Sequence, residues 1–158
     1  NTVKEFKRLI KPDGWLVPNL EFWKNNGYTQ EQNESEGIAI KEALSEFIKD
    51  VNEAVLLVAH NLNFDHKIVG SEMVRLNLRA DQKPKFCTME NTVDLVQLPG
   101  KFEGKFKWPK LEELHNFLFG EKFDGAHDAM NDVKATARCF FELNKRSLLP
   151  SEIMSIIF

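Results

Sequence analysis

The apolar run Ala54–Ala59, with the sequence AVLLVA, constrains the fold more than any other segment of this chain. The run is too short to form a helix of its own, and its β-branched valines favour a strand. Continuous apolar strands are typical of parallel sheets that helices cover on both faces. We therefore predict that residues 54–59 form a buried, central, parallel strand.

Helical periodicity is present on both sides of this run. Before it, from Glu36 onward, apolar residues recur at helical spacing, namely Ile40, Ala43, Leu44, Phe47, Ile48 and Val51. After it, Asn63 is the predicted N-cap of a second helix, whose buried stripe is Val69, Met73 and Leu76. Strands that alternate with helices along the chain indicate an α/β fold.

The remaining segments fit one domain spanning residues 1–158. Val3–Ile10 alternates like a half-buried strand, residues 15–35 are polar and irregular, KFCTM at 85–89 is a short strand end, and residues 97–109 form a loop. Helices are predicted for Leu111–Phe119 and for Ala129 to about Asn144. The inward residues of the last helix are predicted to be Val133, Ala137 and Phe140.

Composition excludes some classes of protein. The net charge of −3 does not indicate nucleic-acid binding, although a local basic patch or a metal site could hold phosphates. Cys87 and Cys139 lack metal-ligand spacing and are expected to be reduced thiols. No apolar run is long enough to span a membrane and no signal peptide is visible, so we expect a cytoplasmic protein.

Asp65 occupies a position at which ligand-binding residues are common in α/β proteins. It follows the predicted strand and lies in the first turn of the next helix. An acidic residue there stabilises the helix dipole, which is a purely structural role. However, ligands of open α/β sheets collect at the carboxyl ends of the strands, so Asp65 is also a candidate site residue.

The segment GAHDAMNDVKATA, residues 125–137, contains a second group of candidates. His127 and Asp132 converge only if His127 lies in the loop before the helix and Asp132 lies one turn inside it. Gly125 permits the bend, and Asp128 is the predicted N-cap. Taken singly, His127 could be a hydrogen-bonded loop residue and Asp132 a solvated helix residue.

Together, two carboxylates and a histidine can bind divalent metal ions and accept a proton from water. Carboxylates are hard ligands that suit Mg²⁺ or Mn²⁺, and two such ions can stabilise both the attacking and the leaving oxygen of a phosphodiester. A neutral histidine beside them can take a proton from the attacking water near neutral pH.

HNLNFD, followed some distance later by HDAMNDVKATA, resembles the DEDDh-type 3′–5′ exonucleases, which include the proofreading epsilon subunit of bacterial DNA polymerase III. FCTM and KWPKLEELHNFLF resemble the segments between those motifs. The resemblance implies that Asp65 and Asp132 bind metal and that His127 is the general base. It also implies that His60, Asn61 and Phe64 shape the site and contact substrate.

One family motif is missing. The first motif, D-x-E on the first strand, has no counterpart here, and neither Asp13 nor Glu21 is a credible substitute. The resemblance implies an RNase H-like mixed sheet flanked by helices, whose first strands would be absent from residues 1–158. We therefore expect residues upstream of Asn1 in the natural protein, because the apolar 54–59 strand would otherwise have an exposed edge.

The stretch KFEGKFKWPK, residues 101–110, interleaves lysines with aromatic rings. Such a stretch can follow a phosphate backbone while bases stack, which makes Lys105 and Lys107 candidate substrate-binding residues. The alternative, slightly favoured from sequence, is a solvated loop whose rings anchor it to the core.

The leading hypothesis is a metal-dependent 3′–5′ exonuclease that releases nucleoside monophosphates from single-stranded ends, DNA favoured, in DNA replication or repair. Two Mg²⁺ or Mn²⁺ ions are the expected cofactors, and a DNA polymerase subunit is a candidate partner. One alternative is oligoribonuclease-like RNA trimming. The others are an inactive nucleic-acid-binding or polymerase-partner module, which the missing D-x-E favours, and an unrelated α/β domain with chance motifs. Little metal binding or turnover is expected of residues 1–158 alone.

Overall fold

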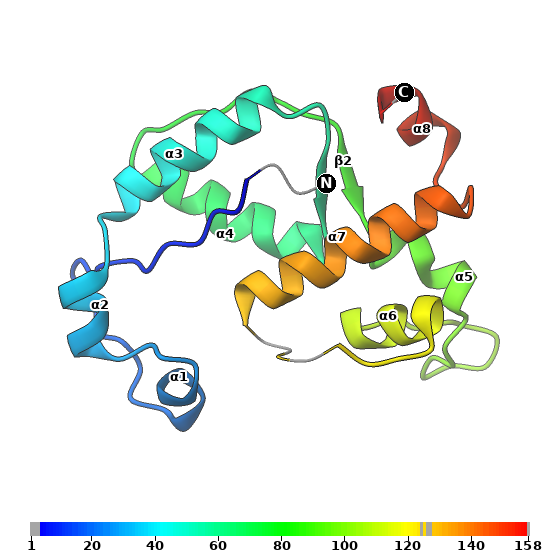
Figure 1. Cartoon of the computed structure of the whole chain (residues 1–158), viewed down its shortest axis with the longest axis horizontal. Coiled ribbons are helices and arrows are strands. Elements are labelled where there is room, and N and C mark those ends of the chain that lie inside the picture. The colour runs from blue at the N-terminus through cyan, green and yellow to red at the C-terminus, as the bar shows by residue number, and fades with distance from the viewer. Residues whose placement is uncertain (1–3, 124, 126–127, 158) are drawn as a thin grey trace. The chain divides into compact units, whose positions relative to one another are not determined.

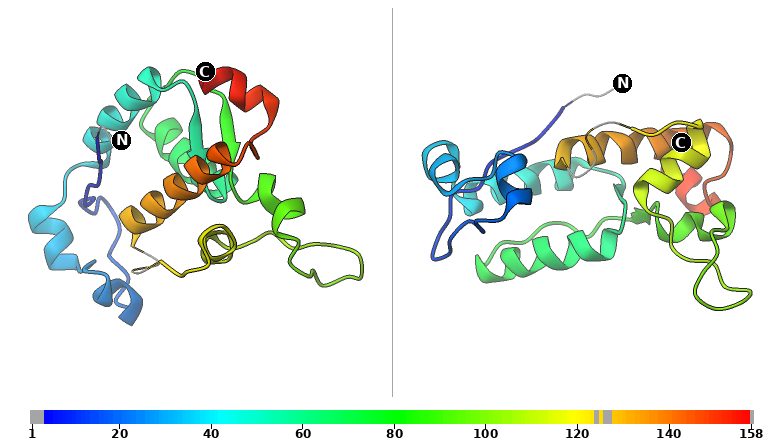
Figure 2. Two further views of the ribbon diagram at one scale, coloured as in Figure 1. Left: turned by 45° about the vertical axis from the view of Figure 1, so that its right-hand side comes forward. Right: turned by 90° about the horizontal axis from the view of Figure 1, so that it is seen from below.

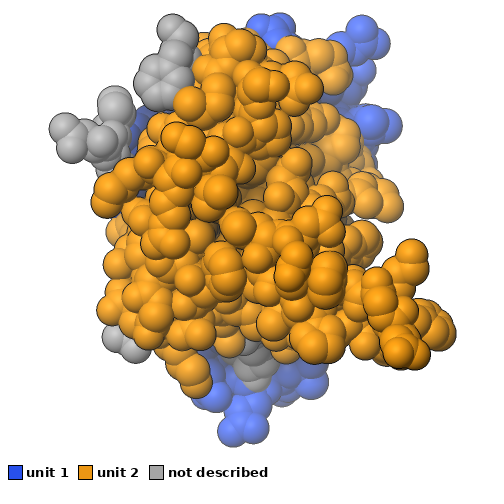
Figure 3. Space-filling model, turned by 90° about the vertical axis from the view of Figure 1, so that its right-hand side faces the viewer, with its two compact units in different colours: residues 1–53, 73–81 blue, residues 54–72, 82–158 orange. Residues whose placement is uncertain are grey.

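The computed structural model describes residues 4–123, 125 and 128–157 (Figure 1), and in it the chain forms two compact units (Figure 3). Unit 1 comprises residues 1–53 and 73–81, and unit 2 comprises residues 54–72 and 82–158. The described part is mixed α/β, mostly helical, with a small parallel sheet, which agrees with the predicted class in outline.

The described part of unit 1 contains α1 (Glu21–Asn25), α2 (Gln30–Glu36) and α3 (Ile40–Glu53). Helix α3 confirms the helical pattern read before the apolar run, and Ala43, Leu44 and Val51 are its buried residues. The prediction that residues 15–35 are irregular is wrong, because α1 and most of α2 lie there. Helix α2 is started locally: the Thr29 hydroxyl accepts a hydrogen bond from the Gln32 N–H at 3.2 Å.

The strand predicted for Val3–Ile10 is not formed over its described residues. Residues 4–9 have no regular secondary structure, and Ile10 makes one isolated parallel bridge with Ile38. Charged side chains of the segment pair with α3 instead, as in the Arg8–Glu46 contact at 3.0 Å. An alternating segment becomes a strand only beside another strand, and none of the described residues of unit 1 supplies one.

The sheet of unit 2 consists of β1 (Leu57–Ala59) and β2 (Lys85–Cys87). They pair in parallel, with Val58 opposite Phe86, as expected for strands joined through a helix. The prediction of a buried central strand is only partly correct: β1 is shorter than the apolar run and half-buried, and only β2 pairs with it among the described residues.

The helices of unit 2 begin close to the predicted residues. Helix α4 (Leu62–Arg75), whose last turn belongs to unit 1, begins before Asn63, so Asn63 is not its N-cap. Its predicted stripe of Val69, Met73 and Leu76 is half-buried rather than buried. Helices α6 (Leu111–Phe119) and α7 (Ala129–Lys145) confirm their predictions. The described elements also include two short helical segments after β2, namely Glu90–Thr92 and α5 (Val93–Val96), and α8 (Ser151–Ile157), for which no prediction was made.

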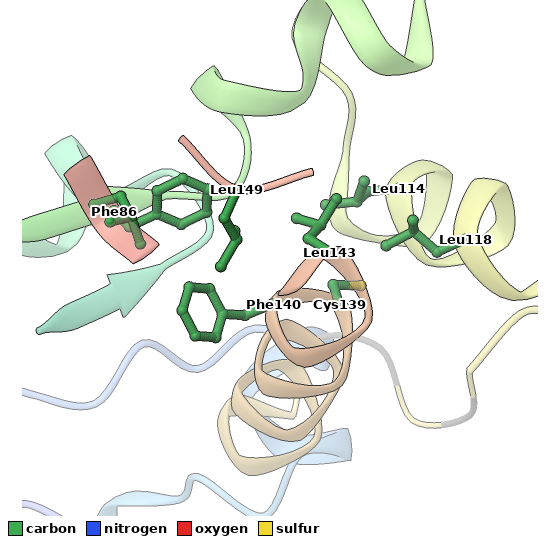
Figure 4. Close-up of a cluster of buried hydrophobic side chains, with 8 residues drawn as sticks. Phe86, Leu114, Leu118, Cys139, Phe140, Leu143 and Leu149 are labelled. Carbon is green, nitrogen blue, oxygen red and sulfur yellow. The ribbon is translucent and has the colours of Figure 1, made fainter. Parts of the chain in front are cut away.

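The core of unit 2 is built around α7, which packs against β1 and lies beside α6 (Figures 1 and 2). Figure 4 shows Leu114 and Leu118 of α6 near Leu143 and Cys139 of α7, while Phe140 lies near Phe86 of β2. The two rings meet edge to face with centroids 5.6 Å apart. The core therefore joins α7 to both the sheet and α6.

Two details of the core differ from or extend the sequence prediction. Val133 was predicted to face inward and is 61% exposed, because the buried stripe of α7 runs through Ala135, Thr136, Cys139, Phe140 and Leu143 instead. Cys87 and Cys139 are both buried and free. Burial raises the pKa of Cys139 to about 12, although the Arg138 charge opposes this, so the thiol stays protonated at neutral pH. None of the described helices is long and apolar enough to cross a membrane.

Candidate active site

Four of the predicted site residues follow the carboxyl end of β1 closely. Strand β1 ends at Ala59, His60 and Asn61 come next, and Phe64 and Asp65 lie in the first turn of α4. Asn61 has a φ of 66°, a left-handed conformation that asparagine tolerates better than most residues, and its carbonyl accepts the Phe64 N–H at 2.9 Å. This turn leads the chain from strand to helix and leaves the Phe64 ring exposed.

His60 connects three segments of unit 2. Its Nε2 lies 3.1 Å from the Pro109 carbonyl oxygen, and its Nδ1 lies 3.0 Å from Thr88 Oγ1. Because a carbonyl can only accept, Nε2 carries the hydrogen. In the neutral ring Nδ1 is then an acceptor for the single Thr88 hydroxyl hydrogen, which also has the Ala59 carbonyl within reach at 3.3 Å. Burial lowers the pKa of His60, although the Pro109 carbonyl and the Asp132 charge act in the opposite direction. His60 therefore holds segments together as a neutral ring near neutral pH.

Asp132 lies in the first turn of α7 and is half-buried. Of the described residues before this helix, Gly125 has a φ of 70°, and its carbonyl accepts the Asp128 N–H at 3.2 Å. Helix α7 packs against β1, and the Asp132 charge acts on His60. Asp132 therefore lies on a helix that packs against β1, the strand from which the chain continues through His60 to Asp65.

Asp65 is exposed as a residue, yet the protein atoms around its carboxyl group displace water. This burial raises the pKa of Asp65, and the hydrogen bond from its own N–H acts in the opposite direction. A carboxylate that loses hydration is stabilised by a nearby positive charge.

The two predicted metal ligands are of a kind that suits a divalent cation. Asp65 and Asp132 are carboxylates, and carboxylate oxygen atoms are the hard ligands that Mg²⁺ and Mn²⁺ prefer. Among residues 4–123, 125 and 128–157, no group of three or more histidine, cysteine or acidic side chains is placed to hold a metal ion. His127, the predicted base, lies outside the described residues.

The aromatic and basic stretch at 101–110 differs from the favoured reading of the sequence. The loop itself is confirmed, but its rings do not anchor it to the core: Phe102 is 77% exposed and Trp108 is 63% exposed. Of the two predicted substrate-binding lysines, Lys105 is exposed, whereas Lys107 Nζ makes an ion pair with Glu113 at 2.5 Å. Lys107 therefore helps to fix the stretch to α6.

Sequence reasoning missed Thr88 and Pro109, the partners of His60. Thr88 is fully buried and its N–H donates to the Ala59 carbonyl at 2.9 Å, which continues the ladder between β1 and β2. Thr88 lay inside the predicted strand end KFCTM, and a polar residue at the carboxyl end of a parallel strand was a usable signal, because parallel strands end at the same edge. Pro109 offers only a backbone oxygen, for which no residue type is a signal.

The Asp128 cap yields a first prediction. One Asp128 carboxylate oxygen accepts the Met130 N–H at 3.0 Å and the Asn131 N–H at 3.2 Å, which fixes the turn that carries Asp132. We expect Asp128→Ala to lower the free energy of unfolding by about 1 kcal/mol in urea titrations, because two helix N–H groups lose their acceptor. Asp128→Asn keeps an acceptor oxygen and is expected to retain most of the stability. An equal loss in both variants would contradict the capping role.

Comparison with known proteins gives consistent matches. The sequence profile of the RNase T family, described as Exonuclease, matches residues 1–140. The chain is 32% identical over 142 residues to "DNA polymerase III PolC-type" from Caldanaerobacter subterraneus subsp. tengcongensis, covering 89% of this chain and 9% of that protein. It is 31% identical over 113 residues to "Ribonuclease T" from Photobacterium profundum, covering 69% of this chain and 48% of that protein. The chain thus spans less than half the length of each of these two relatives.

Proposed function

The chain belongs to the RNase T exonuclease family, and on this premise we propose that it is a metal-dependent 3′–5′ exonuclease acting on single-stranded nucleic-acid ends. The observation that carries the proposal is the family match over residues 1–140, and it is supported by the places of Asp65 and Asp132 in the first turns of α4 and α7, the latter packed against β1. An RNase H-like fold, in which further strands would extend the small sheet, is part of the same proposal.

In this proposal each residue has a separate role. Asp65 and Asp132 would hold the divalent cations, which supply positive charge to the attacking and leaving oxygen atoms when bound. Water attacks the terminal phosphorus, and His127 accepts its proton. The bond from phosphorus to the 3′ oxygen of the preceding nucleotide breaks, and that oxygen takes a proton from solvent to become the 3′ hydroxyl of the shortened strand. The other product is a nucleoside 5′-monophosphate. His60 acts through position alone, because both of its ring nitrogens are engaged by Thr88 and Pro109.

DNA is the favoured substrate, because the match to the PolC-type polymerase covers more of this chain than the match to ribonuclease T. The second match favours trimming of RNA 3′ ends as the alternative. If DNA is the substrate, the role would be proofreading or repair as part of a replicative polymerase. The partner that this role implies is a polymerase subunit.

The test is digestion of 5′-end-labelled single strands, DNA and RNA of matched sequence, by the full-length protein with Mg²⁺ or Mn²⁺. We expect stepwise shortening from the 3′ end that stops when a chelator removes the metal, and faster digestion of DNA. His127→Ala is expected to digest far more slowly, because the attacking water loses its base. No digestion by the wild-type protein, with oligonucleotide binding intact, would instead favour the inactive binding module.

A further inference from the structure

Residues 98–108 form an ordered hairpin, which we call the aromatic hairpin. The Lys107 N–H donates to the Leu98 carbonyl at 2.9 Å and the Gly100 N–H donates to the Lys105 carbonyl at 2.8 Å. The two sides approach closely at Gly100, where an added Cβ would lie 2.6 Å from the Lys105 carbonyl oxygen. The side chains of this segment are therefore held on a defined backbone.

This hairpin presents its rings to solvent instead of burying them. Phe102 and Trp108 are largely exposed, and Phe106 is 43% exposed. Single exposed apolar residues are common on protein surfaces, but several large rings on one short segment mark an interaction surface. Its ligand must therefore offer flat or apolar faces.

The lysines around the rings indicate which class of ligand the hairpin could bind. Residues 101–110 contain four lysines and one glutamate, in a chain whose net charge is −3. Lys101 and Lys105 are exposed, whereas Lys107 is paired with Glu113. A ligand with planar faces and regular negative charges is a single-stranded nucleic acid, whose bases stack on rings while lysines contact its phosphates. The bases of a duplex are already stacked on one another and could not do so.

The residue that follows the aromatic hairpin, Pro109, contacts a residue of the candidate active site. Trp108 is followed by Pro109, whose carbonyl accepts the hydrogen bond from His60 Nε2 at 3.1 Å. His60 in turn directly follows β1, against which α7, the helix that carries Asp132, packs. A short covalent and hydrogen-bonded path therefore links the Trp108 backbone to the residue that follows β1, while the rest of the hairpin extends away from it along the chain.

We propose that the aromatic hairpin binds the single strand several nucleotides upstream of the 3′ end, with Phe102 and Trp108 as stacking surfaces and Lys101 and Lys105 as phosphate contacts. The proposal rests on the proposed exonuclease function for the direction of the strand, and it adds a binding surface that depends on the length of the substrate. A dinucleotide would occupy the active site alone, and a longer strand would occupy both.

The experiment uses the full-length protein and measures Kd by fluorescence anisotropy for an oligothymidylate of about 15 nucleotides and for a thymidine dinucleotide, with Ca²⁺ in place of Mg²⁺ to slow cleavage. We expect the double variant Phe102→Ala, Trp108→Ala to weaken binding of the long strand at least about tenfold, and to leave dinucleotide binding unchanged. Phe117→Ala removes an exposed ring of α6 and is the matched control, with no expected effect. Trp108→Phe should restore most of the binding lost in Trp108→Ala, which a folding defect would not explain.

The salt dependence of single-strand binding distinguishes an exposed lysine from a lysine that is paired with a glutamate. Lys105→Ala is expected to reduce the slope of log K against log salt concentration by about 0.7, the value for one lost phosphate contact on a single strand. Lys107→Ala, which loses an ion pair to Glu113, should change this slope less.

Unchanged affinity of the double variant for the long strand would overturn the proposal and would leave the rings for a protein partner. That result is distinct from failure of the proposed function, in which the wild-type protein hydrolyses neither substrate with Mg²⁺ whatever the hairpin binds.

Discussion

Asp132→Asn is expected to lower the rate of 3′–5′ digestion by at least about 100-fold in the full-length protein, the largest change in activity that this structure predicts among its described residues. The substitution keeps the size of the side chain and removes its negative charge. Helix α7 should still form, because the bond from the Asp132 N–H to the Asp128 carbonyl, 2.9 Å long, is made by the backbone. The loss should therefore appear in the chemical step and in metal affinity.

Two measurements separate these effects. Single-turnover digestion of an end-labelled strand at rising Mn²⁺ concentration should show both a lower maximal rate and a higher metal requirement. Asp94→Asn, which removes an exposed carboxylate from α5, is the matched control for a change of charge and should digest like the wild type. If Asp132→Asn digests at the wild-type rate, then Asp132 does not hold the metal and the assignment of the site is wrong.

The sequence predicted those parts of the fold whose signals are local. Helices α6 and α7 were found from the pattern within each segment, and α7 also has a capping residue, Asp128, at its start. The missed α1 has only five residues, and the missed α2 has seven residues that are all polar, so periodicity could not reveal them. The 3–10 strand failed for another reason: a strand needs a partner, and alternation says nothing of whether one is present.

The site shows the same division between local and distant signals. The positions of Asp65 and Asp132 in first turns of helices followed from neighbouring residues. The hydrogen bonds of His60 did not, because its partners are 28 and 49 residues away in the chain. The exposure of Trp108 was also unpredictable, since an aromatic residue in a loop has the same sequence pattern whether its ring is buried or not. These contacts depend on tertiary packing, which only the structure specifies.

Leu143→Ala is expected to lower the free energy of unfolding by about 2–5 kcal/mol, the largest loss of stability among the predictions made here. Leu143 is 1% exposed and lies among Leu114 and Leu118 of α6, so truncation leaves a cavity at the contact between the two helices (Figure 4). The same helix carries Asp132 three turns earlier, so loss of this packing should also loosen the candidate site.

Val133→Ala on the same helix is the matched control. Its side chain is 61% exposed, so removing two methyl groups there uncovers no core, and we expect a change of stability within about 0.5 kcal/mol. Urea unfolding followed by circular dichroism would measure both variants, as a shift of the midpoint at an unchanged slope. The sequence pattern alone predicted that Val133 faces inward, so the comparison distinguishes the observed packing of α7 from the predicted one. A larger loss for Val133→Ala than for Leu143→Ala would mean that α7 is rotated about its axis, which would also turn Asp132 away from His60 and remove the geometric basis of the candidate site.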